Sequence, residues 1–173
     1  MSITPLWRTA LNFGAMSGIS SFGLFLILYV KGINPLGPSS WLGAWIPVVF
    51  ICIATRYYRD RILGGFITYW QGFRTGMLTA ICGSFLFALF IYSFAKIYGT
   101  DIVELFKNDA IQGMEDAKYI LGDDLYDQGM ESLEKITIGT MASNDFFTKM
   151  LGAVLVCLIT AAAYRKLPSP IDE

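Results

Sequence analysis

The stretch YWQGFRTGMLTAICGSFLFALF, residues 69–90, decides the class of this protein. The chain is uncharged from Thr75 to Ala95, which is long enough for a helix to cross a bilayer, since a membrane helix needs about 20 apolar residues. Small residues recur at every fourth position, namely Gly72, Gly76, Ala80, Ser84 and Ala88. Residues four apart share one side of an α-helix, so the stretch predicts a membrane helix with a groove of small side chains along one face.

Three further apolar segments are long enough to cross a bilayer. Together they give four predicted membrane spans, at residues 9–30, 38–55, 72–97 and 146–164. Apolar residues make up 54% of the 173-residue chain and charged residues only 16%, whereas soluble domains carry roughly 25% charged residues. We therefore expect an all-α fold, a four-helix transmembrane bundle that forms a single integral membrane domain over residues 1–173.

Basic residues predict the orientation of these spans. Most of those that flank the spans fall on one side, namely Arg8, Arg56, Arg59, Arg61, Arg165 and Lys166. The segment 100–144 lies on the other side and holds ten acidic residues but only three lysines. Because Lys and Arg are enriched in cytoplasmic loops, we expect both termini in the cytoplasm and residues 100–144 outside.

The outer segment, residues 100–144, has a helical pattern of its own. Two apolar stripes have helical spacing, with Gly122 between them; they are Val103, Phe106, Ala110, Met114 and Ala117, and then Leu125, Met130, Leu133 and Ile136. We expect an outer acidic amphipathic helical hairpin between the third and fourth spans. It can lie on the lipid surface, fold over the bundle or dock on a partner protein, and docking is favoured because anionic lipid repels an acidic helix. Calcium binding is a further alternative, although no twelve-residue calcium loop is present.

Small residues predict where the helices touch. The predicted helix-packing groove comprises Gly14, Gly18, Gly72, Gly76, Ala80 and Ser84. Helices gain no hydrophobic energy by meeting in lipid, so close backbone approach at small side chains is what lets them pack. We expect the first and third spans to form the closest pair. The contact can form within one chain or across a dimer, and we favour a contact within one chain.

Arg74 is the charged residue nearest the start of the third span. With Gln71 and Thr75 it forms a candidate contact for a lipid phosphate. The alternative, which we favour, is that Arg74 reaches the interface as an anchor while the neighbouring polar groups form interhelical hydrogen bonds.

Several classes of site are excluded or disfavoured by composition. The chain has no histidine, so it lacks the usual proton shuttle and any histidine-activated nucleophile. Its three cysteines are too scattered for a zinc motif or a disulfide framework. The net charge is −1, which gives no basic surface for nucleic acid. We expect no catalytic residue, no cofactor and no metal.

The order of these features resembles a known family. The third span and its approach read FITYWQGFRTGMLTAICGSFLFALFIYSFAKI, residues 66–97, and the acidic helical segment DIVELFKNDAIQGMEDAKYILGDDLYDQGMESLEK, residues 101–135, follows. The chain then returns through a short span to AAAYRK, residues 161–166. From about Ala10 to Lys166 this resembles the domain-of-unknown-function 4199 family of four-span membrane proteins in Gram-negative bacteria. The resemblance implies an inner-membrane location and supplies neither an activity nor catalytic residues.

Three functions remain as hypotheses. We favour a non-catalytic accessory or assembly subunit of a larger inner-membrane complex, with a membrane-protein partner or self-association. The alternative is a small-molecule or lipid carrier that works as an oligomer. A lipid-modifying enzyme that uses Asp101 or Asp145 is the third hypothesis, and it would need a metal or a raised pKa.

Overall fold

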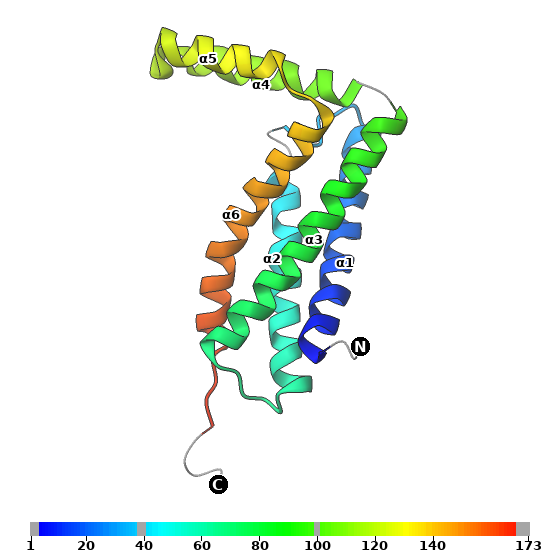
Figure 1. The fold of residues 1–173 in the computed structure, drawn as a ribbon, viewed down its shortest axis with the longest axis vertical. Helices are drawn as coiled ribbons and strands as arrows, with labels where there is room; N and C mark the ends of the chain where they lie inside the picture. Colours follow the sequence, from blue (N-terminus) through cyan, green and yellow to red (C-terminus); the bar gives the residue numbers. More distant parts are fainter. Residues whose placement is uncertain (1–3, 38–40, 99–100, 169–173) are drawn as a thin grey trace.

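The computed structural model describes residues 4–37, 41–98 and 101–168. Within this part the chain forms six α-helices and one π-helical turn (Figure 1). They are α1 (Pro5–Val30), α2 (Trp41–Tyr57), η2 (Tyr58–Ile62), α3 (Tyr69–Tyr98), α4 (Asp101–Leu121), α5 (Asp123–Glu134) and α6 (Ile138–Tyr164). Among the described residues, one isolated antiparallel β-bridge joins Ile67 to Lys166.

The long helices form the predicted bundle. Four of those described, α1, α2 with η2, α3 and α6, are long and apolar enough to cross a membrane, which confirms the all-α class. Figure 1 shows them side by side, with the start of α1 and the end of α6 at the same end of the bundle. We call this the arginine end, because η2 places Arg59 and Arg61 there, and we call the opposite end, which carries α4 and α5, the hairpin end.

The helix α6 extends further than the fourth predicted span, because it begins at Ile138 rather than near residue 146. A capping box starts it: Thr137 Oγ1 accepts the N–H of Thr140 at 3.2 Å, and Thr140 Oγ1 accepts the N–H of Thr137 at 2.8 Å. The added turns place Asp145 and Lys149 inside the helix, where they pair with each other. Two oppositely charged residues four apart are compatible with a helix. A span predicted from apolar residues alone therefore begins too late in the chain.

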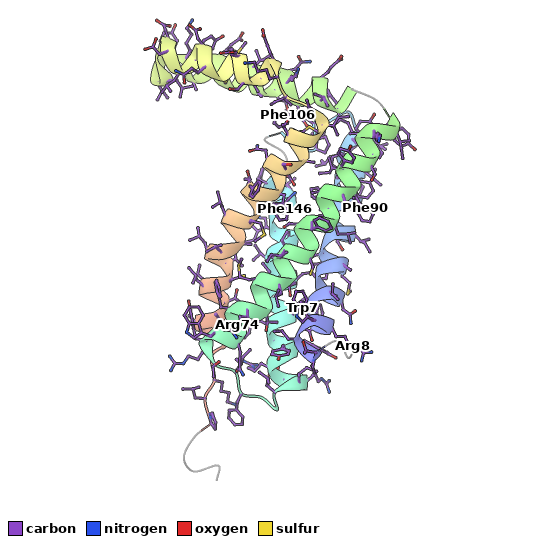
Figure 2. The ribbon with its side chains drawn as sticks, in the orientation of Figure 1. Trp7, Arg8, Arg74, Phe90, Phe106 and Phe146 are labelled. Carbon is purple, nitrogen blue, oxygen red and sulfur yellow. The ribbon has the colours of Figure 1, made fainter. Side chains whose placement is uncertain are left out.

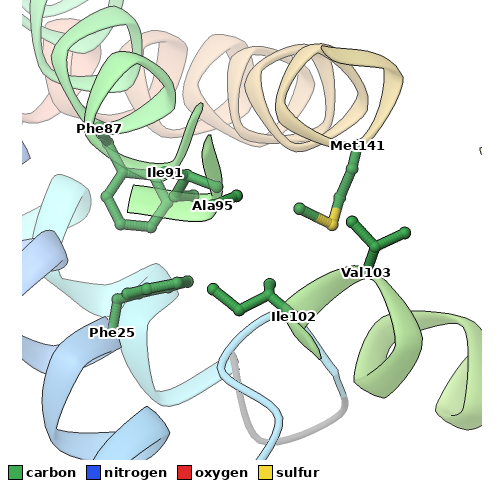
Figure 3. Close-up of a cluster of buried hydrophobic side chains, with 7 residues drawn as sticks. All are labelled: Phe25, Phe87, Ile91, Ala95, Ile102, Val103 and Met141. Carbon is green, nitrogen blue, oxygen red and sulfur yellow. The ribbon is translucent and has the colours of Figure 1, made fainter. Parts of the chain in front are cut away.

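A cluster of apolar side chains closes the hairpin end (Figure 3). Its buried members come from α1, α3, the first turn of α4 and the first turn of α6; they are Phe25, Phe87, Ile91, Ala95, Ile102, Val103 and Met141. Phe106 packs against the cluster from α4, and Ile136 and Ile138 pack against it where the chain returns. The start of α4 is therefore anchored on the bundle.

Beyond this anchor, α4 and α5 form the predicted helical hairpin. Gly122, with φ of 78°, provides the left-handed residue that the turn between them requires. The side chain of Met114 packs against the backbone at Gly129, so α4 and α5 are in contact there. Figures 1 and 2 show the hairpin extending sideways from the bundle, roughly across its axis, rather than folding over it. Further along α4, Asn34 Nδ2 in the segment after α1 donates to Asp109 Oδ2 at 2.8 Å.

Candidate functional site

A cavity of about 780 Å³ lies between α2 and α6 and extends along α6 from Asp145 to Thr160. Helices α1 and α3 close its inner side through Leu24, Phe25 and Phe87. Its rim includes Trp45 of α2 and Ile159 of α6, which are 61% and 69% exposed. Because side chains on both helices of the rim are exposed, the cavity opens at the side of the bundle, on a surface that would face lipid.

Small residues create this space. Gly43 and Ala44 of α2 and Gly152 and Ala153 of α6 line the cavity. A Cβ added to Gly152 would meet no atom within 4 Å, so the glycine does not bring α6 against a neighbour. Gly14 and Gly76 let helices touch, whereas Gly152 leaves a volume unfilled.

The charged side chains that line the cavity form an ion pair on α6, and hydroxyl groups of Ser21, Ser84 and Thr148 also line it. Lys149 Nζ donates to both oxygens of Asp145, at 2.8 Å to Oδ1 and 2.6 Å to Oδ2. The same Nζ lies 3.5 Å from the centre of the Phe87 ring on α3, close enough for a cation–π interaction. Both charged side chains line the cavity and are about one-fifth exposed, at 21% for Lys149 and 19% for Asp145.

This pair lies well inside a membrane-crossing helix. With a rise of about 1.5 Å per residue, Lys149 is about 16 Å from the start of α6 and about 22 Å from its end. Ionisable residues at such positions are rare because charge is costly in hydrocarbon, so they mark functional sites by default. Lys149 lies near one end of the predicted span 146–164 and is not among the predicted site residues. The spacing of Asp145 and Lys149, one helical turn apart, was the signal that could have found the pair.

The three residues of the candidate phosphate contact do not converge. Arg74 is exposed at the arginine end, as Figure 2 shows. Gln71 Oε1 instead accepts the N–H of Thr68 at 2.9 Å and its hydroxyl at 3.1 Å. Thr75 is fully buried, and its hydroxyl donates to the backbone oxygen of Gln71 at 2.7 Å. The geometry therefore supplies one exposed guanidinium rather than a three-residue site.

The glycines of the predicted groove lie at two different interfaces. A Cβ on Gly14 would lie 2.6 Å from Cys82 Cβ, and one on Gly18 would lie 2.9 Å from the Gly83 oxygen, so both glycines pack on α3. The most extensive helix contact in the described bundle is indeed that between α1 and α3. A Cβ on Gly72 or Gly76, by contrast, would meet α6 and α2 rather than α1.

The rest of the predicted groove lies toward the cavity between α2 and α6. Ala80 packs in a buried cluster with Ile51, Ala153 and Cys157, and Ser84 lines the cavity. The regular small-residue stripe of the third span is therefore not the surface that meets the first span. Helix α3 has small residues on two sides, because Thr79 and Gly83 form a second surface next to the regular stripe, and α1 uses that second surface.

The Asp101 side chain, which one hypothesis invoked as a catalytic acid, lies outside the part of the chain whose side chains are described. Asp145, the other candidate acid, is held by Lys149 in two hydrogen bonds. No cluster of three or more acidic or cysteine side chains that could hold a metal ion occurs among the described residues.

Comparison with known proteins identifies a family but no activity. A family model described as a protein of unknown function (DUF4199) matches residues 12–166. No curated protein and no solved structure matches the chain. The match covers most of α1, the whole of the other three bundle helices and the hairpin, and it agrees with the resemblance found in the sequence. The chain belongs to the DUF4199 family of proteins of unknown function.

Proposed function

We propose that this protein is a non-catalytic membrane protein that holds the apolar chain of one lipid in the cavity between α2 and α6. The cavity carries the proposal: its volume of about 780 Å³ lies within the roughly 300–1,000 Å³ of small-molecule sites. Its rim is made by two helices that are apolar enough to cross a membrane. In a bilayer, the molecules that meet such an opening are lipids.

The absence of histidine from the chain supports a binding role rather than an enzymatic one. Near the cavity, the hydroxyl of Thr160 donates to the Val156 carbonyl oxygen at 2.6 Å, within its own helix. The carboxylate of Asp145 is neutralised by Lys149, so it does not offer an unpaired base. These groups can orient a bound molecule, and none of them is arranged with a second group to activate a nucleophile.

Lipid retention by the purified protein tests this proposal. The protein would be extracted from its native membrane in mild detergent and examined by native mass spectrometry. We expect one lipid per chain in the natural protein and loss of that lipid in Gly152→Leu, because the leucine side chain occupies the cavity. The control is Gly23→Leu, which adds the same atoms to a membrane helix at a position that also has no atom within 4 Å of the new Cβ but does not line the cavity. Equal lipid retention in all three proteins would overturn the proposal.

A role as an accessory subunit of a larger membrane complex is the second candidate function. The hairpin supports it, because its tip exposes Tyr119 fully and Ile120 to 87%. Large apolar side chains exposed together on a projecting element are typical of binding surfaces. We expect a protein to co-purify in a fixed ratio and to be lost in Tyr119→Ser/Ile120→Ser, whereas Gln112→Ser, on an exposed position of the same helix, retains it. Purification of a single chain in every case would reject this role.

We also propose that the membrane is the bacterial inner membrane and that the arginine end faces the cytoplasm. The grouping of Arg56, Arg59, Arg61 and Arg165 at that end supports this orientation. Cysteines introduced at Lys118 or Gln128 should react with a membrane-impermeant reagent in spheroplasts, while a cysteine at Leu167 should react only after lysis. The reverse pattern would show the opposite orientation.

A further inference from the structure

We infer that the Asp145–Lys149 pair selects which lipid the cavity holds, and that the selected lipid carries a hydrogen-bond donor, an ammonium or a hydroxyl group, in its polar part. The inference rests on the proposed function and names the ligand chemistry of the same cavity. It follows from the hydrogen bonds that the two charged side chains already form and from the donor and acceptor positions that they leave free.

The apolar walls cannot choose among membrane lipids. An acyl chain that leaves the bilayer for an apolar cavity exchanges one hydrocarbon environment for another, so it gains little hydrophobic energy. Every common bilayer lipid offers such a chain. Discrimination must therefore come from the polar groups that line the cavity, and the charged ones are Asp145 and Lys149.

Lys149 has little capacity left for a ligand. An ammonium has three N–H donors, and two of the hydrogen bonds of Lys149 go to the oxygens of Asp145. The Phe87 ring, whose centre lies 3.5 Å from Nζ, covers a further side of the charge. A ligand that needs the cation, such as a phosphate or a carboxylate, would have to displace Asp145.

Displacement of Asp145 is unfavourable. The pair lies in a mostly apolar cavity. Removing the partner of a poorly solvated charge costs more free energy than formation of the pair contributed. An anionic head group would gain Lys149 and leave the Asp145 carboxylate without a cation. The neutral pair thus disfavours anionic lipids.

Asp145 does have capacity left. A carboxylate offers about four acceptor positions, and Lys149 uses one on each oxygen. The remaining positions can accept N–H or O–H groups without breaking the ion pair, and hydrogen bonds to a charged acceptor are stronger than neutral ones. A lipid with a donor therefore adds bonds at Asp145, whereas a lipid without one adds none.

A series of head groups with equal charge tests this on the natural protein. Phosphatidylethanolamine, its mono- and dimethyl forms and phosphatidylcholine share one net charge but differ in the number of N–H donors. In nanodiscs that contain equal amounts of the four lipids with matched acyl chains, we expect retention to fall as methyl groups replace hydrogens. The retention of phosphatidylethanolamine and that of phosphatidylcholine should differ by about tenfold, the ratio that corresponds to a difference of about 1.4 kcal/mol in binding free energy. Equal retention of all four, with diacylglycerol no better retained than its O-methyl ether, would overturn the inference.

The two sources of the donor are separated by a second arm. Diacylglycerol presents a hydroxyl and its O-methyl ether does not. Preference for diacylglycerol over the ether, with no trend in the amine series, identifies a hydroxyl lipid, whereas a trend in the amine series identifies an ammonium lipid. Either outcome supports selection by a donor.

A paired variant assigns the preference to this site. Asp145→Leu/Lys149→Met removes both charges at similar volume, so the cavity and its apolar chain should remain while the head-group preference disappears. A preference that survives in this folded variant would overturn the role of the pair. Failure of the inference leaves the proposed function intact if Gly152→Leu still loses its lipid, and retention of lipid by Gly152→Leu would remove both.

Discussion

The two sides of the bundle use small residues in opposite ways. Where α1 meets α3, a Cβ on Gly14 would lie 2.6 Å from Cys82 Cβ and 2.9 Å from the Thr79 oxygen, so the helices touch through their backbones. Where α2 faces α6, a Cβ on Gly152 would meet nothing within 4 Å. We refer to these regions as the α1–α3 contact and the α2–α6 cavity. A glycine in a membrane helix thus indicates close helix packing only when the surface of a neighbouring helix fits against the glycine.

Removing one charge on the cavity side should have the largest effect. Lys149→Met leaves the Asp145 carboxylate without its cation, and breaking a buried pair costs roughly 3–5 kcal/mol. Because both side chains are about one-fifth exposed, we expect the lower part of this range as a loss of stability in detergent. The double variant Asp145→Leu/Lys149→Met should return close to the natural stability. If Lys149→Met and the double variant were equally stable, the pair would not be poorly solvated.

The next largest effect should be at the α1–α3 contact. Gly14→Leu inserts a side chain against the Thr79 carbonyl oxygen, which cannot rotate away, so we expect the upper part of the roughly 1–3 kcal/mol that overpacking costs. The apparent Tm in detergent measures the change. Gly23→Leu, on the same helix with open space at the new Cβ, should leave the Tm nearly unchanged. Similar losses in the two variants would mean that any leucine on α1 is harmful and would remove the distinction between the regions.

Single methyl groups should resolve the comparison more finely. A Cβ on Gly76 would lie 2.8 Å from Cys157 Sγ and 3.2 Å from Ile51 Cγ2, and both of these side chains are buried, so Gly76→Ala should cost about 1 kcal/mol, a typical value for one substitution. Gly152→Ala has open space, and a helical alanine restricts the unfolded chain, so it should be neutral or stabilising by roughly 0.4–1 kcal/mol. Thermal unfolding of both variants in one detergent shows which of them is less stable. A Gly152→Ala variant less stable than Gly76→Ala would contradict the packing described for α6.

The smallest effect is expected at Arg74. The side chain is exposed at the arginine end and does not converge with Gln71 and Thr75, so Lys should serve equally well as an interfacial anchor. We expect Arg74→Lys to stay within roughly 0.5 kcal/mol of the natural protein and to keep the same co-purified lipids. Loss of one anionic lipid from this variant, with the fold intact, would show that a fork of donors binds a phosphate there and would move the lipid site away from the cavity.

The hairpin illustrates a feature that was predictable from local pattern. Its two apolar stripes have helical spacing with a glycine between them, and each stripe can be buried only against the other or against another surface. The structure confirms both helices and their turn. Its sideways direction was not predicted, because that direction depends on how Ile102 and Val103 pack on side chains from α1, α3 and α6.

The ion pair shows why part of the site was not predicted. Asp145 and Lys149 are adjacent on α6 by spacing alone, but their importance depends on the cavity that they line and on Phe87 of α3. Neither the cavity nor the ring can be placed from periodicity. Arg74, in contrast, attracted attention because of its neighbours in sequence, and the structure turns those neighbours to other partners.

The sequence by itself determined the membrane class, the four helices and the helical hairpin, because each depends on apolar runs and helical spacing within one segment. A chain that crosses a bilayer as a helix must also form its backbone hydrogen bonds within that segment. Only the tertiary structure decided which face of α3 meets α1, which glycines touch a neighbour and where a volume stays open. Those outcomes depend on the fit between surfaces far apart in the chain, since no hydrophobic force draws helices together in lipid and van der Waals contact requires both surfaces to match.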